Sequence, residues 1–188
     1  MALVGILLAA GRGKRFDPSG VQNKLLQPLS TGDAVVAASA KNMLAVMPRV
    51  VAVVRPGDDQ VAALLGKLGC EVRVCADADL GIASSLTAAV EYTKGAEGWL
   101  VALGDMPHVR PETMQALVAT ITRGARIAAP IFEGRRGNPV AFSSYHLPLL
   151  LALEGDQGAR DILKSHAVSE LIVDDVGVVR DIDTPGDL

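Results

Sequence analysis

The chain has few of the residues that would place it in several common protein classes. Its 188 residues include only two cysteines, Cys70 and Cys75, and 18 lysines and arginines stand against 21 acidic residues. Two cysteines do not make the disulfide framework of a small secreted domain, and we expect both to be buried free thiols of a reducing compartment. A formal net charge of −3 provides no broad cationic field for a polyanion, so nucleic acid is not an expected partner.

Long apolar segments are also missing. The apolar run at residues 3–10 is far shorter than the roughly 20 residues that span a bilayer. No basic segment precedes it, and Arg12, Lys14 and Arg15 follow it, which is the wrong order for a signal peptide. We therefore expect a cytoplasmic protein with no membrane segment. A composition of 49% apolar and 21% charged residues suits one domain over residues 1–188.

The apolar pattern predicts alternating strands and helices. Apolar strands are expected at residues 3–9, 50–54 and 99–103, with a short strand at 71–74. Apolar residues recur at helical spacing at residues 36–47, 61–68, 82–90 and 111–121. This alternation predicts an α/β fold with a doubly wound, mainly parallel sheet and ligands at the carboxyl ends of its strands.

The remaining third of the chain is less regular. We expect strands near a sheet edge at 127–131 and 139–142, one helix at 156–166, and closing strands at 171–173 and 178–182. The polar segment 133–138 between the first two of these strands is predicted to form a lip for an acceptor substrate.

A basic, glycine-rich loop follows the first strand. Gly11 and Gly13 allow backbone N–H groups to turn toward an anion, and Arg12, Lys14 and Arg15 place three cations within four residues. The loop matches neither GxxxxGK[ST] nor GxGxxG, so we interpret it as a different triphosphate cradle, with a solvated basic turn as the alternative. Lys24, further along the same loop, is either another charge for the triphosphate or a solvated lysine.

Two acidic segments are candidates for a metal site. Asp105 follows a buried strand in Gly104-Asp105-Met106-Pro107, and one carboxylate with phosphate oxygens and waters is how Mg²⁺ is usually held. A turn or helix-capping role is the alternative. Near the end of the chain, alternation around Ile182 places Asp181 and Asp183 on one strand face, so either is a candidate second ligand unless the segment is only an acidic terminus.

Together these segments resemble the nucleotidyltransferases with a glycosyltransferase-A-like fold, and within them the molybdenum cofactor cytidylyltransferases. The similarity spans nearly the whole chain, in order, through Leu8-Ala9-Ala10-Gly11-x-Gly13-x-Arg15-Phe16, Asn23-Lys24-Leu25-Leu26, Ser84-Ser85-Leu86, Gly104-Asp105-Met106-Pro107, Gly155-Asp156-Gln157-Gly158-Ala159-Arg160 and Asp181-Ile182-Asp183-Thr184-Pro185. The resemblance implies transfer of CMP from CTP to the phosphate of molybdopterin. It also implies Mg²⁺ as cofactor, with Mn²⁺ as another metal, and a molybdenum hydroxylase apoenzyme as recipient of the product.

The resemblance further implies which residues act. Nucleotide binding is implied for Ala9, Ala10, Gly11, Arg12, Gly13, Arg15, Lys24, Ser84, Ser85 and Asp105. Acceptor binding is implied for Asn138, Pro139, Asp156, Gly158 and Arg160, with Arg160 a candidate for the acceptor's phosphate. Arg15, Lys24 and Asp105 would be catalytic, and Asp105 with Asp183 would hold the metal.

Three alternatives to the cytidylyltransferase remain at this stage. The guanylyl branch of the family tends to carry a second glycine where this chain has Ala10, so the base preference rests on Ala9-Ala10-Gly11. A sugar-phosphate or alditol-phosphate nucleotidyltransferase would use the same triphosphate apparatus with another acceptor. A non-catalytic module that delivers a cofactor would bind nucleotide without releasing pyrophosphate, and the presence of both Asp105 and Asp183 counts against it.

Overall fold

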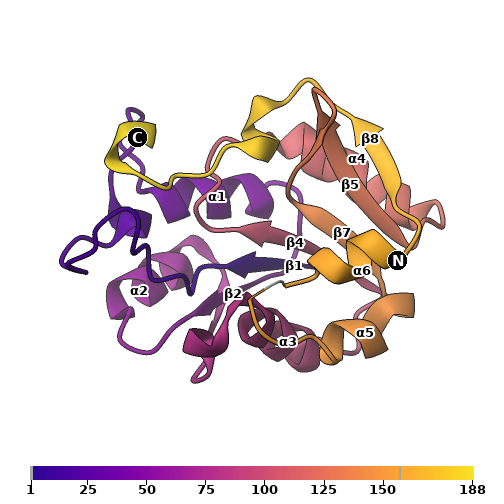
Figure 1. Ribbon diagram of the computed structural model, residues 1–188, viewed down its shortest axis with the longest axis horizontal. Helices are drawn as coiled ribbons and strands as arrows, with labels where there is room; N and C mark the ends of the chain where they lie inside the picture. The colour runs from indigo at the N-terminus through magenta and orange to yellow at the C-terminus, as the bar shows by residue number, and fades with distance from the viewer. Residues whose placement is uncertain (1, 157) are drawn as a thin grey trace.

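The computed structural model describes residues 2–156 and 158–188 (Figure 1). Gln157, part of the motif at residues 155–160, lies outside the described residues. Within these ranges the strands are β1 Leu3–Leu8, β2 Val50–Val54, β3 Glu71–Val74, β4 Gly98–Leu103, β5 Ile127–Phe132, β6 Arg135–Arg136, β7 Val140–Ser143 and β8 Ser169–Ile172. The helices are α1 Val35–Leu44, α2 Asp59–Leu68, α3 Ile82–Tyr92, α4 Pro111–Thr122, α5 Leu147–Leu151 and α6 Arg160–Ser165.

The strands form one sheet in the order β3-β2-β1-β4-β7-β5-β6, with β8 also paired to β5. The four strands β3, β2, β1 and β4 are parallel, and Leu8 pairs with both Val53 and Leu103. The carboxyl ends of β1, β2 and β4 therefore meet at one edge of the sheet, as the sequence predicts. All six residues of β1 are buried, as expected for a central strand covered on both faces.

The second half of the sheet differs from the prediction. β7 is antiparallel to both of its neighbours, β4 and β5, so it lies inside the sheet and the predicted position near an edge is wrong. All four of its residues are buried, which suits a strand paired on both sides. Ala128 of β5 pairs with Ala141 of β7 and with Ser169 of β8, so β7 and β8 flank β5 on opposite sides.

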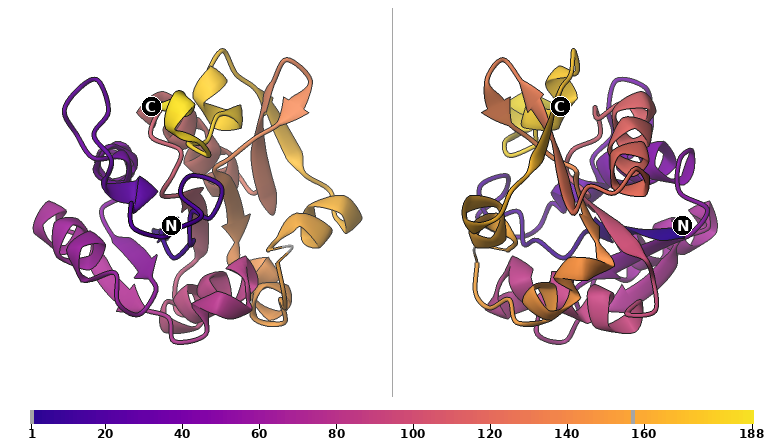
Figure 2. Two further views of the ribbon diagram at one scale, coloured as in Figure 1. Left: turned by 60° about the vertical axis from the view of Figure 1, so that its left-hand side comes forward. Right: turned by 90° about the vertical axis from the view of Figure 1, so that its right-hand side faces the viewer.

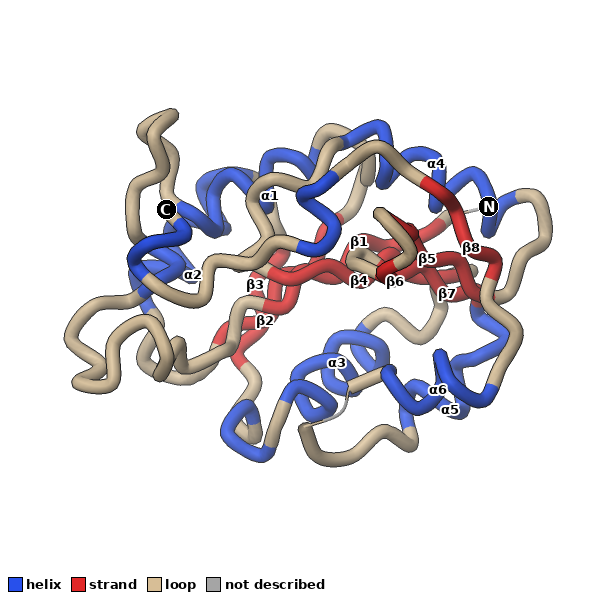
Figure 3. Tube along the Cα trace, turned by 45° about the horizontal axis from the view of Figure 1, so that its top comes forward, coloured by secondary structure: helices blue, strands red, loops and turns tan. Residues whose placement is uncertain are grey.

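Helices cover both faces of the sheet, which confirms the doubly wound α/β architecture. α1, α2 and α4 pack on one face and contribute to one apolar core, whereas α3, α5 and α6 pack on the other face and contribute to a second core (Figure 3). The turned views show the same two layers (Figure 2). No helix in the described ranges is long and apolar enough to cross a membrane. Cys70 and Cys75 are buried free thiols with no disulfide bond, as predicted.

Two predicted elements near the end of the chain are wrong or shortened. The helix predicted at 156–166 begins only at Arg160, because Gly155 and Gly158 have φ values of +73° and +54°, which a right-handed helix does not accommodate. Residues 178–182 are not a strand, since a 3₁₀ helix occupies Val176–Val179 and the following segment has no ladder partner. That segment is held instead by the Ile182 N–H, which donates to the Asp105 carbonyl at 2.8 Å.

Candidate active site

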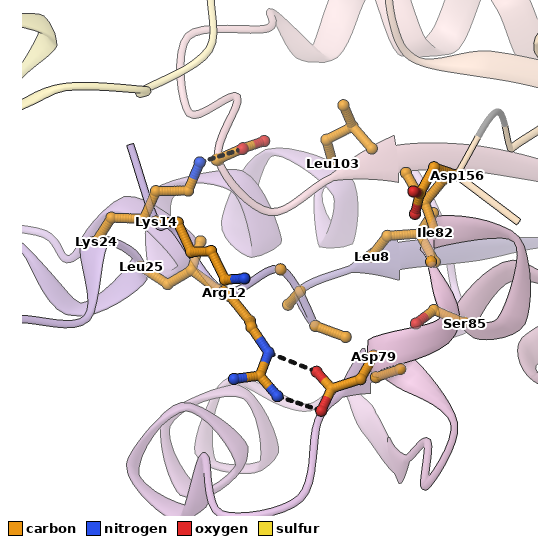
Figure 4. Close-up of a pocket in the computed structure, with 16 residues that line it drawn as sticks. Leu8, Arg12, Lys14, Lys24, Leu25, Asp79, Ile82, Ser85, Leu103 and Asp156 are labelled. Atoms are coloured by element: carbon orange, nitrogen blue, oxygen red, sulfur yellow. Dashed lines mark hydrogen bonds and ion pairs between the residues drawn. The ribbon is translucent and has the colours of Figure 1, made fainter. Parts of the chain in front are cut away.

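Two adjoining cavities lie at the ends of β1 and β4, and the first is drawn in Figure 4. Their volumes are about 340 Å³ and about 420 Å³, and both are lined by Leu8, Ile82, Leu103 and Asp156. Leu8 and Leu103 are the last residues of paired strands, so the cavities occupy the carboxyl edge where open α/β sheets bind ligands.

The glycine-rich loop forms one wall of the first cavity. Ala9, Ala10 and Gly11 line it, and Gly11 has open space where a Cβ would lie. Gly13 is not among the lining residues; it has a φ of +60°, and a Cβ there would stand 3.2 Å from Lys24 Cγ. Gly13 therefore both turns the loop and leaves room for the Lys24 side chain. The buried ring of Phe16, whose N–H donates to the Gly13 carbonyl at 2.9 Å, anchors the turn.

Arg12 reaches across the first cavity to an acidic partner (Figure 4). Its Nε donates to Asp79 Oδ1 at 2.6 Å, and its Nη2 donates to the other carboxylate oxygen. Both side chains are about half exposed. The hydrogen bonds from Arg12 hold the pKa of Asp79 below its ordinary value, so this carboxylate is ionised and competes with any bound phosphate for the guanidinium.

Lys24 is buried among acidic groups. Asn23 caps the short 3₁₀ helix at Lys24–Leu26 by accepting a hydrogen bond from the Leu25 N–H at 3.0 Å, which aims the lysine inward. Its Nζ donates to Asp105 Oδ2 at 2.7 Å and to the Ile182 carbonyl at 2.9 Å. Although a loop of residues 17–22 separates Lys24 from the basic segment, the side chain lines the first cavity.

Three carboxylates converge beside this lysine. Oxygens of Asp105, Asp181 and Asp183 lie within 4.8 Å of one another. The sequence pointed to Asp105 with Asp183, and the structure adds Asp181, which the sequence left as the other candidate. Burial and the negative charges of Asp183 and Asp105 raise the pKa of Asp181 above its ordinary value. A hard divalent cation fits this set, because it takes oxygen ligands and would relieve the mutual repulsion of the carboxylates.

Arg15 lies at the outer side of this acidic cluster. Its Nη1 stands 2.5 Å from Asp183 Oδ2, and its side chain is 79% exposed. It is not among the residues that line the first cavity. In the described structure Arg15 therefore neutralises a carboxylate of the acidic cluster, while Arg12, Lys14 and Lys24 are the cations that face the cavity.

The N-terminus of α3 closes the junction of the two cavities. Ser85 is buried and lines the first cavity, whereas Ser84 lines neither of them. Gly81, just before the helix, has a φ of +124°, and a Cβ there would overlap the Gly155 carbonyl oxygen. That oxygen accepts a hydrogen bond from the Ala83 N–H at 3.2 Å. Docking of residue 155 on α3 brings Asp156 into the lining of both cavities.

The second cavity gathers most of the residues predicted to bind an acceptor. Asn138, Asp156, Gly158 and Arg160 line it, whereas Pro139 is buried outside its lining. Sequence reasoning placed Arg136 in the acceptor lip without singling it out, and it missed the lining residues Lys164 and Phe142. Arg136 belongs to the polar segment that was predicted as an acceptor lip, and Lys164 follows Arg160 at one-turn spacing, so a signal for both was present.

Comparisons with known proteins agree with this geometry. The family model of the MobA-like NTP transferase domain matches residues 5–171. The Purine catabolism protein PucB of Bacillus subtilis (strain 168) is 32% identical over 196 residues, which cover 97% of this chain and 92% of that protein. The chain therefore belongs to the MobA-like NTP transferases, and it is a nucleotidyltransferase that acts on a nucleotide substrate.

Solved structures resemble the whole chain. The crystal structure of Rv0371c from Mycobacterium tuberculosis H37Rv has a TM-score of 0.85 and 28% identity, covering 100% of this chain and 96% of that one. A complex of Rv0371c with manganese has a TM-score of 0.79 and 26% identity, with the same coverage. Both cover this chain over its full length, including the acidic segment near its end.

Proposed function

We propose that this nucleotidyltransferase transfers CMP from CTP to the phosphate of molybdopterin, forming the cytosine dinucleotide and releasing pyrophosphate. The observation that carries the proposal is the arrangement of two adjoining cavities that share four lining residues. One is lined by Ala9, Ala10, Gly11 and a set of cations beside an acidic cluster, and the other is lined by most of the residues that the family resemblance implies for the acceptor.

The first cavity is proposed to hold the nucleoside triphosphate. Arg12, Lys14 and Lys24 supply positive charge on its lining, and the open backbone at Gly11 suits a phosphate oxygen. Ser85 contributes a hydroxyl on the α3 side, where the ribose and base would lie. The methyl group of Ala10 is proposed to favour CTP over GTP, since a glycine at this position leaves more room for a base.

The acidic cluster is proposed to hold Mg²⁺ through Asp105 and Asp183, with Asp181 as a third carboxylate. Mn²⁺ is the alternative ion, and the manganese complex of Rv0371c supports a divalent metal. Bound there, the ion would supply positive charge to the α-phosphate and to the leaving pyrophosphate. Lys24 would remain as a second cation beside Asp105, and Arg15 would hold Asp183 in place.

The transfer follows from this placement. An oxygen of the acceptor phosphate attacks the α-phosphorus in line, a new P–O bond forms, and the bond to the bridging oxygen of the β-phosphate breaks. The pyrophosphate leaves with that electron pair, and Arg12 and Lys24 neutralise the charge that grows on it. A phosphate nucleophile is already deprotonated near neutral pH, so positioning replaces a general base.

Pyrophosphate release tests the proposal. The protein is incubated with Mg²⁺, molybdate-loaded molybdopterin and one of CTP, GTP, ATP or UTP, with the pterin left out as control. Release with CTP alone that requires the pterin supports the proposal. A preference for GTP would make the protein a guanylyltransferase. Pyrophosphate release only with a sugar phosphate or an alditol phosphate would show that one of these compounds, and not molybdopterin, is the acceptor. Binding of CTP without pyrophosphate release under any of these conditions would indicate a non-catalytic protein that delivers a cofactor.

The product has a proposed destination. A molybdenum hydroxylase apoenzyme would receive the cytosine dinucleotide, and we propose that both proteins meet in the cytoplasm. The buried free thiols of Cys70 and Cys75 are consistent with a reducing compartment.

A further inference from the structure

Asp175 is a buried carboxylate that lines neither of the two cavities. Its side chain is 2% exposed, and it caps the 3₁₀ helix at Val176–Val179 by accepting a hydrogen bond from the Gly177 N–H at 3.0 Å. Its other oxygen accepts from the Arg110 N–H at 2.9 Å and from the Thr113 hydroxyl at 2.7 Å. Burial of a carboxylate is costly unless such donors surround it, so these contacts fix the turn that carries Asp175.

The amino end of α4 depends on this carboxylate. Arg110, the residue before the helix, makes no capping hydrogen bond with its own side chain, and Pro111 has no N–H to donate. Asp175 supplies the missing acceptor from a distant part of the chain, and its negative charge also suits the positive end of the helix dipole. The turn at Asp175 is therefore docked on the start of α4.

The start of α4 is continuous with the loop that carries Asp105. Residues 104–110 join β4 to α4, and Asn42 of α1 holds this loop by donating to the Pro107 and Val109 carbonyls, each at 3.0 Å. Asp105 is thereby fixed relative to the start of α4. A segment that docks on the start of α4 is fixed relative to Asp105 as well.

The segment that follows this turn carries the other two carboxylates of the acidic cluster. Residues 180–184 form neither a helix nor a strand, so no ladder sets their position. Gly177 lies so close to the loop of Asp105 that a Cβ there would stand 2.1 Å from the His108 carbonyl oxygen. Further along, the Ile182 N–H donates to the Asp105 carbonyl at 2.8 Å. A few separate contacts therefore position this segment, and the anchored turn supplies those at its beginning.

We propose that Asp175 is a positioning residue for the metal site, because its three hydrogen bonds hold Asp181 and Asp183 close to Asp105. Oxygens of these last three carboxylates lie within 4.8 Å of one another, and their like charges oppose that approach until a cation binds. Mg²⁺ requires near-ideal geometry with ligands at about 2.0–2.1 Å, so a small shift of the segment weakens the site. This role of Asp175 rests on the metal site of the proposed function.

Calorimetric titration with Mn²⁺, without nucleotide or pterin, tests the role of Asp175. Thr113→Val removes one of its three hydrogen bonds and keeps the shape of the side chain. Only the docked segment, which completes the metal site, loses this contact, so Mn²⁺ affinity should fall about two- to tenfold, the range for one lost hydrogen bond. Asp175→Asn turns an amide NH₂ toward a backbone N–H in either orientation, because each carboxylate oxygen accepts from one, and should weaken binding at least as much. Thr113→Ser keeps the hydroxyl and should retain wild-type affinity.

Thr93→Val is the matched control for a general loss of stability. Thr93 is also buried, and its hydroxyl accepts from Trp99 Nε1 at 2.9 Å and donates to the Ala89 carbonyl at 2.7 Å. Trp99 lies near the amino end of β4, whereas Asp105 follows its carboxyl end. The control should lower the melting temperature at least as much as Thr113→Val does, and it should leave Mn²⁺ affinity unchanged.

The outcomes separate this role from the cytidylyltransferase proposal. Wild-type Mn²⁺ affinity in both Thr113→Val and Asp175→Asn, or an equal loss in Thr93→Val, would overturn the positioning role of Asp175. Mn²⁺ affinity that is also unchanged in Asp105→Asn would place the metal elsewhere and would overturn the role of Asp175 with it. Absence of pyrophosphate release with CTP and molybdopterin would overturn the proposed function and would leave the Mn²⁺ affinities of these variants as they are.

Discussion

Replacing Asp105 by asparagine tests the candidate metal site most directly. The substitution keeps the size and shape of the side chain and removes one negative charge from the group Asp105, Asp181 and Asp183. It also removes the charge from the strongest contact of Lys24, the hydrogen bond of 2.7 Å to Asp105 Oδ2. The variant therefore loses one carboxylate of the proposed metal site and leaves the surrounding chain in place.

The effect on stability should be modest. Lys24 keeps the Ile182 carbonyl at 2.9 Å and Asp183 at 3.6 Å, and the amide oxygen of asparagine can still accept a hydrogen bond. The loss is then the difference between a charged and a neutral acceptor, about 1–2 kcal/mol. The effect on turnover should be far larger, about 10³-fold or about 4 kcal/mol in the activation barrier, because the metal and its ligand charge act on the transition state.

Steady-state pyrophosphate release and thermal melting together measure both effects. Asp33→Asn is the control, since Asp33 also binds a lysine, Lys41 Nζ, at 2.7 and 2.8 Å on the surface. The control should retain turnover, and Mn²⁺ binding measured by calorimetry should weaken only in the Asp105 variant. Turnover at the wild-type rate in Asp105→Asn with normal melting would show that the metal site is misplaced.

Three further predictions concern other parts of the structure. Arg12→Gln should lower kcat/KM for the nucleoside triphosphate by at least about tenfold, with both a higher KM and a lower kcat, because Arg12 is proposed to meet the charge that grows on the leaving pyrophosphate. Asp79→Asn, which frees Arg12, should lower that KM. Gly81→Ala should raise the KM for the acceptor because its Cβ would displace the neighbouring loop, whereas Gly57→Ala, also at positive φ but in open space, should not. His146 is buried, and desolvation is the main cause that lowers its pKa. Its contribution to stability is therefore present above pH 6.5 and lost as the pH falls. His146→Asn should make the melting temperature depend less on pH between pH 7 and 5.

Each of these predictions has a contrary result. An unchanged triphosphate KM in Arg12→Gln would mean that Arg12 serves only its ion pair with Asp79. Equal effects of Gly81→Ala and Gly57→Ala would reduce the role of Gly81 to local backbone strain. A pH dependence that is the same with and without His146 would assign acid sensitivity to other groups.

Local pattern was enough to predict most of the regular elements. The strands Leu3–Leu8 and Val50–Val54 were predicted to within one residue, because a buried parallel strand requires a continuous apolar run. The partly exposed strand Glu71–Val74 was also predicted at its observed bounds. The predicted edge position of Val140–Ser143 was wrong, because a short apolar strand has the same sequence pattern at the edge of a sheet and in its interior. Which strand lies beside it depends on pairing across the chain, which no local window contains.

The sequence by itself determined the α/β fold through its alternating apolar pattern, and the resemblance of its motifs to a known family indicated a nucleotidyltransferase. Only the tertiary structure decided that Lys24 lies against Asp105, 81 residues away, and against the carbonyl of Ile182, 158 residues away. It also decided that Arg136 and Lys164 share a cavity with Phe142. The physical reason is that the interaction of two charges depends on the distance between them in space. That distance is set by how the helices pack on the sheet, which the local propensity of each element does not determine.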